Sequence, residues 1–162
     1  MKTFVETEAE KSSQSKDAVR QFSTFYIDGQ WFGIDVMQVQ EVTKPLPVTA
    51  MRAAPPFIRG LINLRGQIAT AIGLREFFGL KSLDSTDRMT VVCRVDDVLL
   101  SLQVDQIGDV IEVSQSQFEH CPATVRQSVR AFMAGVYKME GQILSILCLQ
   151  SVVKELDKRC AA

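Results

Sequence analysis

The sequence predicts an all-β fold made of two small barrels. Residues 57–68 are echoed 75 positions later by residues 132–143, and residues 27–42 realign on residues 95–110. Short apolar runs are separated throughout by turn signals, and only small helices are indicated. A match at two similar offsets indicates one unit used twice. The matched pairs include Phe57/Phe132, Gly60/Gly135, Gly66/Gly141, Val36/Val104 and Gln38/Gln106.

The length of the chain indicates that the two copies share one domain. The chain has 162 residues, of which 46% are hydrophobic, enough for a sizeable core. Each copy of roughly 60 residues would be marginal alone, so the copies should fold as one intimate body. We predict a flexible leader at 1–18, which has few large apolar groups, and a single domain at 19–160. Its barrels should span about 21–85 with the C-terminal helix, and 88–148. The seam between them is expected to hold partner proteins.

The first hairpin has the clearest local pattern. Residues 21–27 and 30–36 are apolar, aromatic-rich runs separated by Asp28 and Gly29, a pair typical of two-residue hairpin turns. Gly33 within the second run indicates a bend or bulge where a small barrel turns its corner.

The rest of the first copy contains short elements. Residues 37–41 are expected to form a brief helical turn, and 42–49 an extended edge segment, because its two prolines exclude a central strand. Residues 57–64 and 67–72 read as strands around a tight turn at Arg65 and Gly66, with Gly66 at positive φ. A helical turn at 74–78 and a polar boundary at 81–87 follow.

The second copy repeats this plan and ends in a helix. After a polar interlude at 114–129, the last two strands flank a Glu140-Gly141 turn. Leu149, Val152, Val153 and Leu156 recur at helical spacing, which predicts an amphipathic C-terminal helix. The strands predicted for this copy are residues 89–95, 98–104, 107–113, 132–139 and 142–148.

Charge and hydropathy exclude two classes of partner. The net charge is −1 and the isoelectric point about 5.9, so the chain lacks the basic balance of nucleic-acid or membrane-surface binders. The N-terminal segment has no apolar signal core, and no run approaches the 18 or so apolar residues of a membrane span. We expect a cytoplasmic protein that binds no nucleic acid and does not insert into a membrane.

The cysteines and the single histidine do not indicate a metal or redox site. Cys93, Cys121, Cys148 and Cys160 lie far apart without a C-x-x-C spacing, and His120 is the only histidine. We expect the four thiols to be reduced and to have no chemical role, and we expect the protein to bind no cofactor and no metal.

Catalysis is not indicated either. None of the common nucleotide-binding, zinc-protease or serine-hydrolase motifs occurs, and one histidine leaves little scope for general-base chemistry. Carboxylates near predicted strand ends could act as acid and base, but ion pairing or solvation explains them more simply. These carboxylates are Asp35, Glu41, Asp105 and Asp109.

Glu41 and Arg65 are candidates for partner specificity. The second copy has Asp109 and Glu140 at the equivalent positions, so the barrel turn itself does not require a positive charge. The alternative is that Arg65 pairs with a carboxylate such as Glu41 within the chain and only fixes the fold. Both can hold if the pair borders a partner-binding surface. Exposed apolar residues are the other indication, although most of them should be ordinary core. The apolar residues concerned are Phe57, Ile58, Leu61, Ile62, Val39 and Val42.

In these segments the chain resembles the CheW family of chemotaxis coupling proteins. The likeness spans about residues 21–156 and depends on motifs that occur together and in order. These are Phe32-Gly33-Ile34-Asp35-Val36, Val39-Gln40-Glu41-Val42, the run from Pro56 to Gly66, and Leu74-Arg75.

The resemblance implies a fold, a function and a site. The fold would be two intertwined five-stranded SH3-like barrels. The function would be that of a non-enzymatic adaptor between the cytoplasmic tips of methyl-accepting chemoreceptors and the regulatory domain of the histidine kinase CheA, recruited to membrane-associated receptor arrays. Carried over residue by residue, the receptor-facing groove would include Val39, Glu41, Gly60, Arg65 and Val110, and the kinase would contact barrel ends.

Two positions differ from the usual family pattern. Thr70 stands where the family usually has proline, and Gly73 where it usually has aspartate. The alternative function is therefore a divergent CheW-like scaffold for a non-flagellar array, such as one that controls surface motility.

Overall fold

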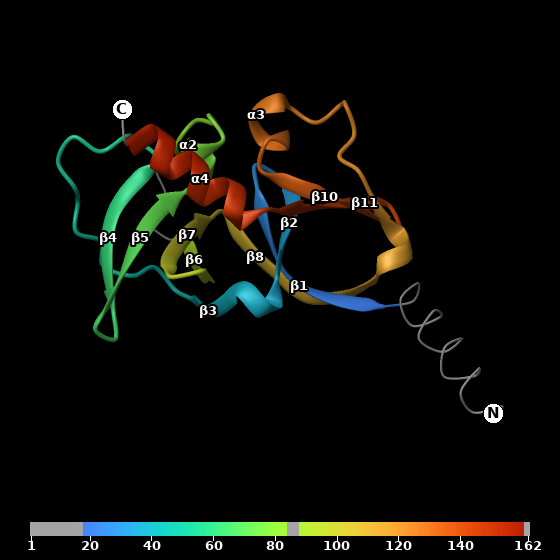
Figure 1. Cartoon of the computed structure of the whole chain (residues 1–162), viewed down its shortest axis with the longest axis horizontal. Coiled ribbons are helices and arrows are strands. Elements are labelled where there is room, and N and C mark those ends of the chain that lie inside the picture. Colours follow the sequence, from blue (N-terminus) through green and yellow to red (C-terminus); the bar gives the residue numbers. More distant parts are fainter. Residues whose placement is uncertain (1–17, 84–87, 161–162) are drawn as a thin grey trace.

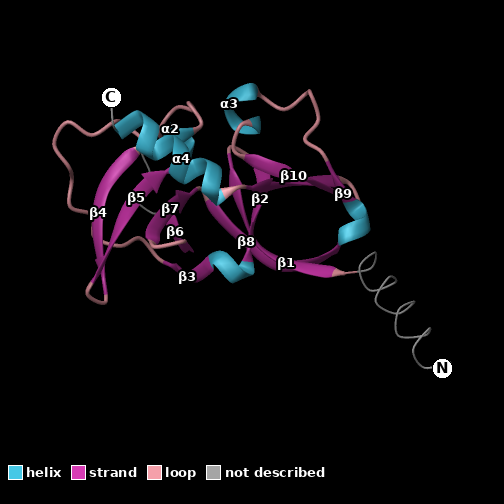
Figure 2. Cartoon of the chain, in the orientation of Figure 1, coloured by secondary structure: helices cyan, strands magenta, loops and turns pink. Residues whose placement is uncertain are grey.

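Two β-sheets, each rolled into a barrel, form the body of the protein in the computed structural model, which describes residues 18–83 and 88–160. Figure 1 shows the two barrels side by side, and Figure 2 shows that strands dominate both. The expected all-β class with short helices is confirmed. The leader predicted at 1–18 falls almost wholly outside the described residues, as do residues 84–87 of the predicted boundary.

The first sheet has five strands in the order β3-β6-β7-β5-β4. Its strands are β3 (Val39–Thr43), β4 (Ile58–Leu64), β5 (Gln67–Gly73), β6 (Met89–Val95) and β7 (Val98–Val104), and the helix α2 (Leu74–Phe77) follows β5. We call this sheet with α2 barrel 1.

The second sheet has six strands in the order β8-β1-β2-β11-β10-β9. Its elements are β1 (Val19–Ile27), β2 (Gln30–Asp35), β8 (Gln106–Ser114), β9 (Phe118–Glu119), α3 (Gln127–Arg130), β10 (Met133–Met139) and β11 (Gln142–Leu147). We call it barrel 2. Five strands were predicted here, and the sixth is the two-residue β9. Its counterpart in the first copy is the single bridge between Thr49 and Leu61.

The two copies exchange their first hairpins. The β1–β2 hairpin comes from the first copy, but it pairs with β8 and, in parallel, with β11 of the second. The β6–β7 hairpin comes from the second copy and pairs with β3 and, in parallel, with β5 of the first. The predicted division at 21–85 and 88–148 therefore does not match the sheets, because each sheet takes strands from both ranges.

The tight turns follow the expected chemistry. Asp28 and Gly29 join β1 to β2 with φ of 52° and 76°, and Arg65 and Gly66 join β4 to β5 with φ of 51° and 83°. Positive φ at both central residues defines the type I′ turn, whose twist suits a hairpin. The short turn predicted at 37–41 is the 3₁₀ helix η1 (Val36–Gln38), which begins directly after β2 ends at Asp35.

The seam between the barrels is filled with side chains. Among the described residues, the largest buried apolar cluster draws on β1 and β2 of barrel 2, on α2, β5, β6 and β7 of barrel 1, and on the C-terminal helix α4 (Leu149–Cys160). Smaller clusters lie inside each barrel. The interior of the seam is therefore packed core, and the hollow beside it, lined in part by Phe32 and Phe78, holds only about 70 Å³. Partner binding at the seam stays a prediction.

Helix α4 returns over the first barrel. It follows β11 of barrel 2, yet Figure 1 shows it lying across the half of the molecule that contains β4 and β5. Leu149, Val152 and Leu156 are buried on one face, as their spacing predicts. At its C-terminal end the Arg159 guanidinium lies 4.8 Å from the centre of the Phe77 ring, a cation–π contact with barrel 1.

Candidate interaction site

The Glu41–Arg65 pair is formed in the structure. An Arg65 Nη atom lies 3.0 Å from Glu41 Oε2, and the side chains are 77% and 20% exposed, respectively. Glu41 lies on β3 and Arg65 at the β4–β5 turn, so the pair links the two edge strands of barrel 1. Only one carboxylate oxygen is engaged. The other, Glu41 Oε1, is buried without a hydrogen-bond partner.

Arg65 has an unusual backbone conformation. Its φ of 51° places it in the left-handed region, where asparagine, aspartate and glycine are favoured. Asn63 supports the turn because its side-chain oxygen accepts a hydrogen bond from the Gly66 amide at 3.1 Å. An exposed arginine held at a strained turn position indicates a requirement for the side chain itself.

Gly60 allows two backbone segments to approach each other closely. It is buried on β4, where the register shifts between Ile58 and Gly60, and its φ is 143°. A Cβ at this position would overlap the Thr49 carbonyl oxygen and lie 2.7 Å from Val48 Cγ1. Thr49 and Leu61 exchange two 2.8 Å hydrogen bonds directly alongside. Gly60 thus lets the segment at 48–49 lie close against β4 and pair with it.

The other two candidate residues lie in different sheets. Val39 is half-buried at the start of β3, packs against the seam core and pairs with Cys93. Val110 is exposed on β8 in barrel 2, where it pairs with Ser23. The structure therefore brings Glu41 and Arg65 into contact, with Val39 two residues away on the same strand. It places Val110 on the other barrel.

The exposed apolar residues differ in part from those expected. Phe57 and Ile62 are core, Val39, Ile58 and Leu61 are half-buried, and Val42 is exposed. Sequence patterning missed other large exposed groups: Met37 in η1, and Ile68 and Val98 at the starts of β5 and β7. The position of Met37 in a predicted turn was the one available indication of exposure. Strand alternation cannot show whether the side chain of a strand-end residue is covered by its neighbours.

Barrel 2 also carries a hollow that the sequence did not indicate. Its volume is about 440 Å³, and its lining includes Arg20, Asp35, Met37 and Tyr137. Arg20 donates to Asp35 at 2.6 Å, and this hydrogen bond raises the pKa of the guanidinium. Burial raises the pKa of Tyr137, whose hydroxyl donates to Gln115 at 3.0 Å. The residues come from strands distant in sequence, so no local pattern marks the hollow.

Three of the four candidate carboxylates are in ion pairs, and the fourth residue, Asp109, accepts a hydrogen bond from Thr24 through its backbone carbonyl. Asp35 pairs with Arg20, Glu41 with Arg65, and Asp105 with Arg75 at 2.6 Å. In the ranges 18–83 and 88–160, no three His, Cys, Asp or Glu side chains are grouped to hold a metal ion. All four cysteines are free, and burial raises the pKa of Cys93 to about 12, so its thiol stays protonated at neutral pH. Among the described helices, none is long and apolar enough to span a bilayer.

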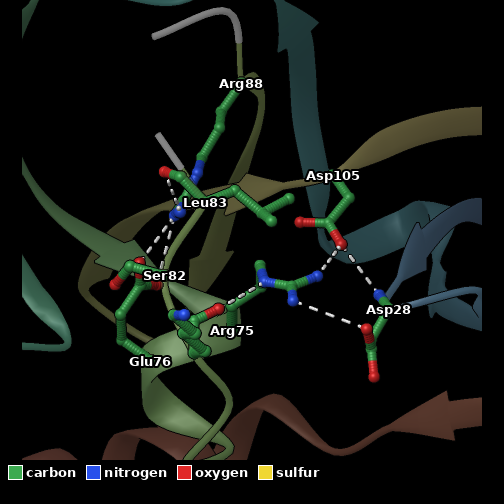
Figure 3. A network of polar contacts seen from close by, with 8 residues as sticks. Asp28, Arg75, Glu76, Ser82, Leu83, Arg88 and Asp105 are labelled. Carbon is green, nitrogen blue, oxygen red and sulfur yellow. Dashed lines mark hydrogen bonds and ion pairs between the residues drawn. The ribbon is translucent and has the colours of Figure 1, made fainter. Parts of the chain in front are cut away.

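A second group of charges surrounds α2, as Figure 3 shows. Arg88 lies 2.9 Å from Glu76 Oε1, and the Ser82 hydroxyl donates to the same oxygen at 2.8 Å. Gly73 leaves room for this carboxylate, since a Cβ there would overlap Glu76 Oε2. Burial opposes ionisation of Glu76, but the bonds from Ser82 and the backbone and the charge of Arg88 outweigh it, so the pKa lies below its ordinary value of 4.5.

The depressed pKa of Glu76 predicts acid sensitivity. A carboxyl whose pKa is lower in the folded protein stabilises it above the unfolded pKa, and this contribution is lost as the pH falls through the folded pKa. We expect Glu76→Gln to be less stable than the parent at pH 7, and the difference to shrink below about pH 4.5. Urea denaturation of both proteins from pH 7 to 3 measures this. A difference independent of pH would contradict the assignment.

Comparison with known proteins places this arrangement in a family. The model of the CheW-like domain matches residues 21–157. The chain is similar to the chemotaxis protein CheW of Rhizobium meliloti, with 29% identity over 143 residues, 88% of this chain and 92% of the relative. It is 31% identical to the chemotaxis protein CheW of Treponema pallidum over 145 residues, 85% of each chain.

A solved structure agrees with the fold. The scaffolding protein TtCheW from Thermoanaerobacter tengcongensis superposes with a TM-score of 0.72 at 29% identity, covering 79% of this chain and 88% of that one. The family match covers most of the described residues and both barrels. The chain therefore belongs to the CheW-like family.

Proposed function

We propose that this chain is a non-catalytic adaptor that couples the cytoplasmic tips of chemoreceptors to a CheA-type histidine kinase. The relatives are named as chemotaxis proteins, and the structural neighbour is described as a scaffolding protein. These names favour chemotaxis over the alternative of a surface-motility array. The adaptor would work in the cytoplasm, recruited to membrane-associated receptor arrays through its partners.

The observation that carries the proposal is the Glu41–Arg65 pair. Arg65 is largely exposed at a turn conformation that arginine rarely adopts, and it is held over a carboxylate that keeps one oxygen unpaired. Half-buried Val39 lies two residues before Glu41 on β3. A charged pair beside apolar side chains is a surface on which an amphipathic helix can dock. Val39, Glu41 and Arg65 would form this receptor-facing surface, with Gly60 of β4 and Val110 of barrel 2 as further members.

The packed seam supports the mechanism. An adaptor transmits a change only if its two partner-binding faces keep a fixed relation. A shared buried core of aromatic and aliphatic side chains joins the barrels into one body. A coupling free energy of about 1–3 kcal/mol would change kinase activity by about 5–150-fold. Individual contacts can be weak, because an array makes them multivalent.

Arg65→Glu tests the site. The expected result is a folded protein whose affinity for a receptor cytoplasmic fragment falls about 10-fold, equivalent to about 1.4 kcal/mol. The change places two carboxylates at the partner-binding surface, whereas an exposed ion pair contributes only about 0–1 kcal/mol to stability. Calorimetry with the receptor fragment and with CheA measures binding, and circular dichroism measures folding.

Two variants serve as controls. Arg65→Asn removes the charge but suits the left-handed turn, so it should weaken receptor binding without loss of stability. Lys138→Glu reverses the charge of an exposed ion pair on barrel 2, where Lys138 lies 3.1 Å from Glu119; it should leave receptor binding unchanged. If Arg65→Glu unfolds, the pair is structural. If the parent protein binds neither receptor nor CheA, the adaptor function fails.

A further inference from the structure

The chain passes directly between the two sheets at two places in its central part. At the first, β2 of barrel 2 ends at Asp35, η1 intervenes, and β3 of barrel 1 begins at Val39. At the second, Asp105 is the only residue between β7 of barrel 1 and β8 of barrel 2. Such short crossings restrict backbone movement. Side chains that bind the crossing residues therefore influence the orientation of one barrel relative to the other.

The Arg75 side chain binds Asp105, the residue at the second crossing. It lies on α2 of barrel 1 and is 7% exposed. Its Nη1 donates to Asp105 Oδ2 at 2.6 Å, its Nη2 to Asp28 Oδ1 at 3.4 Å, and its Nε to the Lys81 carbonyl at 2.9 Å. The Asp28 amide donates to the same Asp105 oxygen at 2.7 Å (Figure 3).

This group of residues connects the two barrels. Asp28 is at the tip of the β1–β2 hairpin, which belongs to barrel 2, whereas Arg75 belongs to barrel 1. One guanidinium therefore holds a helix of one barrel, a hairpin tip of the other and the residue where the chain crosses. We call Arg75, Asp28 and Asp105 the inter-barrel latch.

The second copy has no equivalent of the latch at the first crossing. The 75-residue offset places Gln150 opposite Arg75, and the first crossing is bound differently. There, Asp35 pairs with Arg20 of β1, within the same sheet, and accepts a hydrogen bond from the Met37 amide. Since the two barrels share one plan and only one of the two crossings has the latch, building a barrel does not require it.

Directional bonds at the seam have a consequence that the apolar core does not. The packed seam joins the barrels through apolar contacts, which are individually non-directional, whereas the latch adds bonds with defined directions. Charge-assisted hydrogen bonds fix geometry, and a buried ion pair often adds little net stability compared with apolar residues of the same size. The latch is thus better suited to selecting an orientation than to holding the barrels together.

We propose that Arg75 is a positioning residue: through Asp28 and Asp105 it fixes the orientation of barrel 2 relative to barrel 1, and this orientation transmits the signal between the two partner-binding faces. The second half rests on the proposed adaptor function. The first half concerns the protein alone and is tested without any partner.

The orientation test compares Arg75→Gln with Arg88→Gln in the full-length protein. Arg88 is a matched control, because it is 8% exposed, and its polar contacts among the described residues, to Glu76 and to the Leu83 carbonyl, lie between α2 and β6 of barrel 1. Backbone residual dipolar couplings report the orientation of each sheet. In the parent and in Arg88→Gln, the couplings of both sheets should fit one alignment tensor. In Arg75→Gln, barrel 2 should require a different or averaged tensor, and an unchanged common tensor overturns the proposal.

Asp28→Asn is a second variant that tests the same proposal if Arg75→Gln does not fold. Asparagine suits the left-handed turn at this position, so the hairpin should survive while the charge that Arg75 contacts is lost. Asp28→Asn should produce the same kind of tensor change, smaller in size. If Arg75→Gln unfolds and Asp28→Asn leaves the common tensor unchanged, the proposal is overturned.

The coupling test uses receptor fragment and CheA assembled with each variant. Arg75→Gln should reduce receptor-dependent kinase activation at least about 5-fold, the lower end of typical allosteric coupling, while each partner taken alone binds within about 2-fold of the parent. Arg88→Gln should leave both unchanged. Loss of one binary interaction would show that Arg75 acts on binding, which overturns positioning. If the parent binds neither partner, the adaptor function fails, but the dipolar couplings still decide the latch.

Discussion

Replacement of Gly60 by alanine is expected to lower the free energy of unfolding by about 3 kcal/mol or more. The new Cβ would overlap the Thr49 carbonyl oxygen, a backbone atom fixed by two hydrogen bonds to Leu61. Its φ of 143° is also unfavourable for a side chain. Urea denaturation followed by circular dichroism measures the change. Because domains of this size are stable by only about 5–15 kcal/mol, much of the stability margin would be lost.

Gly66→Ala is the matched control for Gly60→Ala. Gly66 also has a positive φ, 83°, but no atom lies within 4 Å of an added Cβ. Its replacement should cost only the conformational penalty of about 1–2 kcal/mol. Equal losses for the two variants would show that backbone conformation, and not the close approach of the segment at 48–49, explains the need for glycine at position 60.

Phe77→Ala is expected to destabilise the whole protein by about 3–5 kcal/mol. The Phe77 ring lies 4.7 Å from that of Phe132, 5.4 Å from Phe57 and 6.0 Å from Phe78, centre to centre, so the cluster joins both copies of the duplication. Loss of the ring would leave a cavity in the seam. Because the hairpins are exchanged, we expect one cooperative transition in which both barrels unfold together.

Ile68→Ala provides the control for Phe77→Ala. Ile68 is an apolar residue of barrel 1 that is 61% exposed, so its truncation should change stability by no more than about 0.5 kcal/mol. Calorimetry of the parent and both variants measures the transitions. Two separate transitions in Phe77→Ala, with one at the parent temperature, would show that one barrel folds without the other.

The strands and turns could be predicted because their causes are local. Asp28 and Gly29 suit the positive φ values of a two-residue turn, and the predicted strands at 89–95 and 98–104 match β6 and β7 residue for residue. The apolar spacing from Leu149 to Leu156 predicted α4 because a helix repeats every 3.6 residues. The polar interlude at 114–129 was less predictable, since β9 and α3 are too short to show a period.

The candidate site was predicted in part. The Glu41–Arg65 pair was one of two open interpretations, and the structure contains it as an exposed contact that also leaves Arg65 available to a partner. The role of Gly60 was not evident, because Thr49, which packs against it, is eleven residues earlier in the chain and lies in a segment with no recognisable pattern. Arg75 was noticed only as part of a family motif, and its partners Asp28 and Asp105 lie 47 and 30 residues away.

The duplication, the turns, most of the strands and the CheW-like resemblance could be predicted before the fold was known, since each depends on residues close together in the chain or on their repetition. The three-dimensional fold was needed to show which hairpin joins which sheet, that the interior of the seam is a packed core, and that Arg75 spans the second crossing. This is because strand pairing and buried ion pairs satisfy groups from distant segments. Local patterns make such groups available but cannot specify their partners.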